Sequence, residues 1–427
     1  MQEETVRNAL LKNSSIISMP QANLLLLTLK IRGKAIVEVR YEGKLTPFEP
    51  FTSYVELRER GSIFRTSYTG NEIVLSSMWL LKELGSFKSY EAEIKLPTGV
   101  IIDEKGEGFW INNNGHFFSN NSMNPLIILG NFSRIKKEYL RVSIEVYNAN
   151  KGTVDTITSI IRNYSQFLEY PYQSLKVFYL ESLSQKAGFE FPKGIVLVHP
   201  ERNETLLLAH EIAHVWFGDY ASFGRVDESL ANYLAIVCTG SYGLIDYVEN
   251  SLANSTYPLA KIYEGNIFNP RAEAEVYYKG AFIFRSPQFV LGNGTFFEGL
   301  GELLRACHNR ECNLRDIQGV FERVSGRDLD WFFREWFYSK EMPRYRISSL
   351  RGSLEFDIID ESNFTMPVEV QVITPTKSFT KRVWVNGSAR VKFNLKEKPV
   401  EIIIDPNDWI INENGEEIID GIKVRYN

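Results

Sequence analysis

The spacing of apolar and polar residues divides the chain into three regions. Up to about residue 140, short apolar runs alternate with turn residues, a pattern typical of β-strands. From about 150 to 340, apolar residues recur with a period of about 3.6, which indicates amphipathic helices. From about 343 to the end, the strand pattern returns. The pattern predicts an α+β fold with three domains, at 1–140, 141–342 and 343–427.

Individual elements follow from the same pattern. The first region predicts strands at 24–31, 35–41, 53–57, 72–75 and 90–96. The second predicts helices at 154–170, 204–217, 228–238 and 296–306, interrupted by strands at 174–179 and 194–199. The third predicts strands at 354–359, 368–373, 382–385, 391–395 and 400–404, with a hairpin turn at Asn386-Gly387.

The predicted helix at 204–217 contains the sequence His-Glu-Ile-Ala-His, at 210–214. Residues four apart lie on the same helix face, so His210 and His214 can together bind one Zn²⁺. Glu211 lies about 100° further round the helix and can reach a metal-bound water as general base. We expect Asn203 to cap this helix and Gly218 to follow its last turn.

A catalytic zinc needs a third protein ligand from another element. Glu228 is the best candidate, because it opens the next predicted helix and the chain between them is short enough to turn back. Asn232, one turn further on, is a candidate to hold a ligating imidazole by its second nitrogen, and Asp219 competes with it. The alternative is that Asp227 and Glu228 only stabilise the N-terminus of a helix.

Composition excludes some classes of protein. The 48 Lys and Arg residues against 53 Asp and Glu residues give a net charge of −5, which carries no signature of nucleic-acid binding. No apolar run reaches the roughly 20 residues of a membrane span. The start, Met1-Gln2-Glu3-Glu4, lacks the basic segment of a signal peptide, so we expect a cytoplasmic protein. Nine Asn-x-Ser/Thr sequons leave an extracytoplasmic location open.

The chain has three cysteines, Cys238, Cys307 and Cys312. So few cysteines fit a reducing compartment or a single incidental bridge. The segment Cys307-His308 to Cys312 lacks the second cysteine pair of a zinc finger, which favours a structural role over a metal site.

Four motifs together resemble the M1 family of zinc aminopeptidases, the gluzincins. Residues 210–219 are similar to the family's HELAHxWFG(N/D) motif, and residues 227–233 to its NEGFAxY motif. Residues 276–281 resemble its YxKGA pattern and residues 329–336 its closing FFxxW helix. The resemblance implies an N-terminal β-rich saddle, a thermolysin-like and mainly helical catalytic domain, and a C-terminal β-sandwich. Residues 96–99 and 367–405 carry the likeness in the two β regions.

The resemblance also implies roles for individual residues. His210, His214 and Glu228 would bind one Zn²⁺ per chain, and Glu211 would activate the water. Tyr277, at the tyrosine of the YxKGA pattern, would stabilise the oxyanion of the tetrahedral intermediate. Tyr278, its neighbour, should point elsewhere, because adjacent residues do not share a helix face.

Glu190 is the residue that would select the substrate's free α-amine, since an ammonium needs an anion in a low-dielectric cleft. It lies in the segment 188–194, where the family's GxMEN motif is poorly kept. The implied activity is removal of N-terminal residues from peptides. The alternatives are a zinc endopeptidase or oligopeptidase without amine recognition, and a non-catalytic interaction protein stabilised by zinc.

Two lengths differ from the family. Thirteen residues separate His214 from Glu228, where the family usually has 18, and the difference falls at 220–226. The chain also ends after the expected sandwich, so it resembles a compact form without the C-terminal helical domain. Such a site would be more open or covered by a partner subunit, which leaves a homo-oligomer open.

Overall fold

The computed structural model describes residues 132–181, 188–191, 193–201, 204–252, 255–265, 267–348, 350–352, 354–362 and 364–427, and strands alone before residue 131. The chain forms two compact units, Met1–Phe48 and Glu49–Asn427. The predicted strands at 24–31, 72–75 and 90–96 are confirmed, whereas 35–41 and 53–57 lie outside the described residues. The strands of this region are β1 Ser14–Met19, β2 Leu24–Leu29, β3 Thr66–Thr69, β4 Glu72–Leu75, β5 Tyr90–Lys95, β6 Gly99–Ile102, β7 Gly108–Ile111, β8 Asn114–Ser119 and β9 Leu126–Gly130.

Residues 134–198 form a five-stranded sheet with the strand order β10-β11-β12-β14-β13. Strands β11, β12 and β14 run parallel, and β13 returns antiparallel along one edge. All four residues of β14 are buried, as expected of a parallel strand covered on both faces. The edge strand β13 packs against helix α4, Thr205–Ala213. The bounds are β10 Arg134–Tyr139, β11 Val142–Tyr147, β12 Ser174–Tyr179, β13 Gly188–Phe191 and β14 Ile195–Val198.

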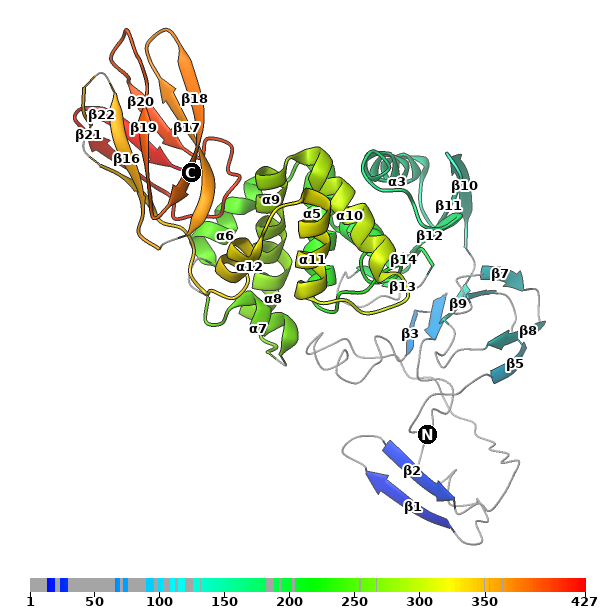
Figure 1. Cartoon of the computed structure of the whole chain (residues 1–427). Helices are drawn as coiled ribbons and strands as arrows, with labels where there is room; N and C mark the ends of the chain where they lie inside the picture. Colours follow the sequence, from blue (N-terminus) through cyan, green and yellow to red (C-terminus); the bar gives the residue numbers. More distant parts are fainter. Residues whose placement is uncertain are drawn as a thin grey trace. The chain divides into compact units, whose positions relative to one another are not determined.

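Helix α3 lies between β11 and β12 in the chain, and the other helices follow the sheet (Figure 1). Helices α4 and α5 pack against each other, α5 packs on α9, and α10 packs on α11. Among the described residues, no helix is both long and apolar enough to cross a membrane. The bounds are α3 Lys151–Tyr164, α4 Thr205–Ala213, α5 Val226–Thr239, η3 Tyr242–Leu244, α6 Ile245–Ser251, α7 Leu259–Glu264, α8 Pro270–Ala274, η4 Glu275–Lys279, α9 Gly280–Leu291, α10 Asn293–Cys307, α11 Leu314–Ser325 and α12 Asp330–Trp336.

Trp216, three residues after the end of α4, fixes this helix against α3. Its indole nitrogen donates to the Glu169 carbonyl at 2.7 Å, and its ring meets the Tyr164 ring edge-on at 5.4 Å. The Tyr164 hydroxyl donates to the Ala209 carbonyl, also at 2.7 Å. Both aromatic side chains are buried, and each places its polar atom on a partner. The helix with the HExxH sequence is therefore held by directed bonds as well as by apolar packing.

The predicted helix at 204–217 is wrong at its C-terminal end, because α4 stops at Ala213. The next amides bond three residues back instead of four, from Val215 to Ile212 and from Trp216 to Ala213, which tightens the last turn. Gly218 then takes a φ of 124°, a backbone conformation that favours glycine, and its amide bonds the Ala221 carbonyl. Glu204 is the N-cap residue, and the expected cap Asn203 lies outside the described residues.

The C-terminal β region forms an eight-stranded hydrogen-bonded sheet, ordered β15-β16-β19-β18-β17-β20-β22-β21. The predicted hairpin at Asn386-Gly387 is confirmed, with Gly387 at a φ of 67° between β18 and β19. The strands are β15 Tyr345–Ile347, β16 Glu355–Asp360, β17 Thr365–Ile373, β18 Ser378–Asn386, β19 Ser388–Lys392, β20 Glu401–Ile404, β21 Gly415–Ile419 and β22 Ile422–Tyr426.

The α+β class and the order of β, helical and β regions are confirmed. The predicted boundary at residue 140 falls in the turn between β10 and β11, two strands of one sheet. Arg285 of α9 connects the helices to the C-terminal sheet region, since its guanidinium lies 4.6 Å from the Trp409 ring centre and donates to the Asn407 carbonyl at 3.0 Å. The division into three domains stays a prediction.

The contact between α10 and α11 gives a test of packing. A Cβ atom added at Gly299 would lie 2.6 Å from the Phe321 ring, so Gly299→Ala is expected to destabilise the protein by about 1–3 kcal/mol. Gly301→Ala is the matched control in the same helix, because its Cβ would meet only Arg305, at 3.7 Å. We expect that change to stabilise by up to about 1 kcal/mol through helix propensity. Urea unfolding measures both, and equal midpoints for the two variants would contradict the packing argument.

Candidate metal centre

The structure brings His210, His214 and Glu228 together in a buried cluster. One ligand-type atom from each lies within 4.8 Å of the others. His210 lies in α4, His214 is its C-cap residue, and Glu228 lies in the first turn of α5. We call residues 215–227, which join His214 to Glu228, the ligand connection. Its turn brings the start of α5 back to the end of α4.

The three donor atoms fit the size of a tetrahedral zinc site. The two Nε2 atoms lie 3.1 Å apart, and Glu228 Oε2 lies 3.3 Å from His210 Nε2 and 3.1 Å from His214 Nε2. Ligand atoms about 2.0–2.1 Å from a tetrahedral zinc are separated by about 3.3–3.4 Å. Two imidazoles and one carboxylate are also ligands that zinc prefers, so the residues present fit this ion.

The second ring nitrogens have different surroundings. His214 Nδ1 lies 2.8 Å from the Phe217 carbonyl oxygen. A carbonyl only accepts, so in the neutral ring Nδ1 carries the proton and Nε2 keeps the lone pair that a metal needs. His210 Nδ1 is buried without a hydrogen-bond partner among the described residues.

The expected roles of Asn232 and Asp219 beside the imidazoles are wrong. The Asn232 amide donates to the Tyr277 carbonyl at 2.6 Å, which ties α5 to η4. Asp219 accepts from the Tyr172 hydroxyl at 2.9 Å and from the backbone amide of Gly194 at 3.2 Å. The turn after Ala213 brings the Phe217 carbonyl to His214 instead. A main-chain carbonyl carries no signal in the residue types, so the sequence does not reveal it.

The charges within the cluster shift the pKa values of Glu228 and His214. Burial raises the pKa of Glu228, but the imidazoles of His214 and His210 outweigh this and hold it well below the usual value. Burial lowers the pKa of His214, but the Glu228 and Glu211 carboxylates outweigh it and raise the pKa to about 9. In the metal-free protein a proton on His214 therefore faces the Glu228 carboxylate. Metal binding must release that proton.

Glu211 lies between the cluster and the edge strand β13. A Cβ atom added at Gly188 would lie 2.6–2.8 Å from side-chain atoms of Glu211, so only a glycine allows this close approach. Burial raises the pKa of Glu211, against the opposing effect of His210 and His214. A raised carboxylate pKa suits a general base that must later return its proton. The contact with Gly188 is one that the sequence pattern does not show.

Glu190 lies two residues after Gly188 and so on the same face of β13, the face that approaches Glu211. Its Oε1 atom is buried without a hydrogen-bond partner among the described residues. Burial and the carboxylates of Asp219 and Glu211 raise the pKa of Glu190 well above its usual value. Burial raises the pKa of Asp219 to about 6, so the Glu190–Asp219 pair holds a proton more readily than two separate carboxylates.

Tyr277 lies in η4 and faces the cluster, with its ring centre 5.5 Å from that of His210. Tyr278 packs instead against Tyr247, edge-on at 5.4 Å. The structure therefore directs the two neighbouring tyrosines to different surroundings, as expected. Wide π-type turns of the kind seen in η4 often occur at functional sites.

Cys307 and Cys312 form a disulfide, the single bridge that the cysteine count left open. Their sulfur atoms are therefore not metal ligands. Cys238 is a free, partly buried thiol in α5. Burial raises the pKa of this thiol, which makes it a weak nucleophile.

Known proteins share both the sequence pattern and the fold. Residues 154–336, which include all the candidate site residues, match the Peptidase family M1 domain. The chain carries an M1 peptidase domain. It is 23% identical over 414 residues to the leucyl aminopeptidase of Saccharolobus solfataricus, covering 79% of this chain and 50% of that protein. It is 22% identical over 324 residues to the probable aminopeptidase 1 of Sulfurisphaera tokodaii, covering 62% of this chain and 41% of that protein.

A solved structure shows the same fold. The aminopeptidase A of Legionella pneumophila, determined in complex with aspartic acid, aligns with a TM-score of 0.61 at 16% identity. The alignment covers 83% of this chain and 49% of that one. The chain therefore spans about half the length, or less, of these three relatives.

Proposed function

We propose that the protein is a zinc-dependent aminopeptidase that removes N-terminal residues from peptides. The observation that carries the proposal is the His210, His214 and Glu228 cluster with Glu211 beside it, inside an M1 peptidase domain. A purely structural zinc site has no use for Glu211 beside the ion or for Tyr277 facing the ligands. The aminopeptidase names of the relatives support the exopeptidase class.

His210, His214 and Glu228 would hold the ion. A bound zinc would supply Lewis acidity, which makes a water molecule nucleophilic near neutral pH and polarises a carbonyl. Glu211 would accept the proton as the water attacks the scissile carbonyl, and would pass it to the leaving amine. The same carboxylate thus serves as base and then as acid, a task for which its raised pKa is suited.

Two further residues would complete the site. Tyr277 would donate a hydrogen bond from its hydroxyl to the oxyanion that forms on the substrate carbonyl. Glu190 would bind the free α-ammonium of the substrate, because its buried Oε1 has no partner among the described residues. The ammonium charge would lower the pKa of Glu190 and displace the proton that it shares with Asp219.

Replacing Glu211 tests the general base. Glu211→Gln keeps the size of the side chain and removes its basicity, so kcat is expected to fall by about 10²–10⁴-fold while zinc binding stays. The measurements are hydrolysis of a panel of aminoacyl fluorophore substrates, with chelator and zinc add-back, and the zinc content after dialysis. A variant that retains wild-type turnover would rule out this role. A wild type indifferent to chelation would rule out the zinc mechanism.

Two adjacent tyrosines give a matched test of oxyanion binding. Tyr277→Phe removes only a hydroxyl and is expected to lower kcat by about 10²–10³-fold, with little change in KM. Tyr278→Phe removes the same group from the residue that packs on Tyr247, so its kinetics should stay within about twofold of the wild type. Steady-state kinetics on one substrate compare the two variants. Equal losses would argue against a specific role for Tyr277.

Blocked substrates separate an aminopeptidase from an endopeptidase with the same metal site. Free-amine peptides are expected to be hydrolysed at least about 100-fold faster than their N-acetylated forms, since an acetylated amine carries no positive charge that could pair with the Glu190 carboxylate. Glu190→Gln should raise KM for the free-amine peptide about tenfold or more and reduce this preference. Glu204→Gln, at an exposed acid before α4, is the control. Equal cleavage of blocked and free peptides would favour the endopeptidase.

A further inference from the structure

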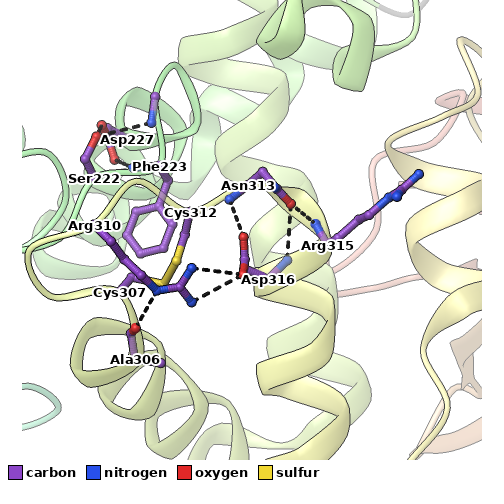
Figure 2. Close-up of a disulfide and its surroundings, with 11 residues drawn as sticks. Ser222, Phe223, Asp227, Ala306, Cys307, Arg310, Cys312, Asn313, Arg315 and Asp316 are labelled. Carbon is purple, nitrogen blue, oxygen red and sulfur yellow. Dashed lines mark hydrogen bonds and ion pairs between the residues drawn. A yellow bond between two sulfur atoms is a disulfide. The ribbon is translucent and has the colours of Figure 1, made fainter.

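The disulfide closes a short loop outside the metal cluster, residues 307–312, which we call the Cys307–Cys312 loop (Figure 2). Cys307 is the last residue of α10, and Cys312 immediately precedes Asn313, the N-cap of α11. Arg310 holds the loop at both ends. Its Nε donates to the Ala306 carbonyl at 2.9 Å, and its guanidinium pairs with Asp316 of α11 at 3.2 Å. The loop is therefore a fixed element between two helices.

The Cys307–Cys312 loop contacts the ligand connection along three successive residues. The His308 ring stacks on the Tyr220 ring with centres 4.1 Å apart, and His308 Nδ1 lies 3.0 Å from the Tyr220 carbonyl oxygen. His308 also pairs with Ala221 in a β-bridge. The Cys312 amide donates to the Ser222 carbonyl at 2.8 Å, and Ser222 forms a β-bridge with Glu311.

The ligand connection in turn reaches both sides of the metal cluster. At its start, the Phe217 carbonyl holds His214 Nδ1, and the Gly218 amide returns to the Ala221 carbonyl. At its end, the Asp227 carboxylate accepts from the Phe223 amide at 2.7 Å and from the Ser222 hydroxyl at 3.3 Å. Asp227 directly precedes Glu228, so these bonds fix the first turn of α5. Figure 2 shows Ser222, Phe223 and Asp227 beside the disulfide.

We propose that the Cys307–Cys312 loop is a positioning element for the metal site, which holds the ligand connection so that His214 and Glu228 meet at one ion. The inference rests on the proposed zinc site. Between α4 and α5 the ligand connection consists of turns and isolated β-bridges, and two of these bridges join it to the Cys307–Cys312 loop. Its central residues, Tyr220 to Ser222, are those that contact the disulfide loop. Groups that orient metal ligands in this way typically change metal affinity by about 10–100-fold when lost.

The experiment has two readouts. Chelator competition measures the affinity for zinc, and the visible spectrum of the Co²⁺-substituted protein reports the geometry of the ligands. Three forms are compared with the oxidised wild type. The first is the wild type treated with a phosphine, which converts the disulfide and one water into two thiols and a phosphine oxide. The second is the Cys307→Ala and Cys312→Ala double variant. The third is His308→Ala, which keeps the disulfide but removes the contacts with Tyr220.

Cys238→Ala is the matched control, since it changes the remaining cysteine, near the far end of α5 from Glu228. All forms are compared at a temperature at which circular dichroism shows them fully folded. If the double variant does not fold, the reduced wild type and His308→Ala carry the test. We expect zinc to bind about tenfold or more weakly to the forms without the disulfide, with an altered Co²⁺ spectrum. His308→Ala should also weaken zinc binding, whereas Cys238→Ala should leave zinc binding unchanged.

Zinc affinity within about twofold of the oxidised wild type, with an unchanged Co²⁺ spectrum, would overturn the positioning role and leave the proposed function intact. An oxidised wild type that binds no zinc would overturn both. A loss of stability that leaves zinc affinity unchanged would show that the bridge only strengthens the fold, and it also counts against the proposal.

Discussion

The buried carboxylate of Glu228 between two imidazoles is the contact on which the rest of the site depends. A carboxylate removed from water is costly unless cationic or hydrogen-bonding partners surround it. Here the Nε2 atoms of His210 and His214 both lie within 3.3 Å of Glu228 Oε2. Glu228 lies in α5, His210 lies in α4, and His214 caps α4. The need to pair the buried carboxylate therefore determines where the two helices meet. The packing of the two helices, the early end of α4 and the turn at Gly218 all help to bring Glu228 to the two histidines.

The position of α4 also determines what lies around the cluster. Trp216 and Tyr164 hold the helix against α3, while β13 passes so close to Glu211 that only a glycine fits at position 188. The edge strand thereby brings Glu190 to the same side as the candidate base. The η4 turn supplies Tyr277, and the Asn232 amide ties that turn to α5. Three separate segments thus converge on the end of one nine-residue helix.

The sequence revealed the parts of the site that depend on local periodicity. Residue type and spacing predict that His210, His214 and Glu228 meet, which the structure confirms, whereas the role of Glu211 stays a prediction. The end of α4 was missed because its 3₁₀-type turn depends on Gly218 and on distant contacts, which periodicity does not contain. The residue types of Asn232 and Asp219 suit a hydrogen bond to an imidazole, and so they predict a role that the structure does not give them. A main-chain carbonyl, at Phe217, holds His214 instead, and the bridge between Cys307 and Cys312 depends on how α10 and α11 approach each other.

The charges around the cluster are consistent with a site that binds two cations. Four carboxylates, of Glu190, Glu211, Asp219 and Glu228, interact with one another or with the two histidines in a largely buried region. Glu228 is compensated by the imidazoles and would be compensated further by a dication. Asp219 is stabilised by the Tyr172 hydroxyl and the Gly194 amide, whereas burial and the neighbouring carboxylates raise the pKa of Glu190 and favour its protonated form. If the proposed function holds, a substrate ammonium would stabilise the Glu190 carboxylate, and the arrangement proposed to hold the metal would also favour peptides with a free N-terminus.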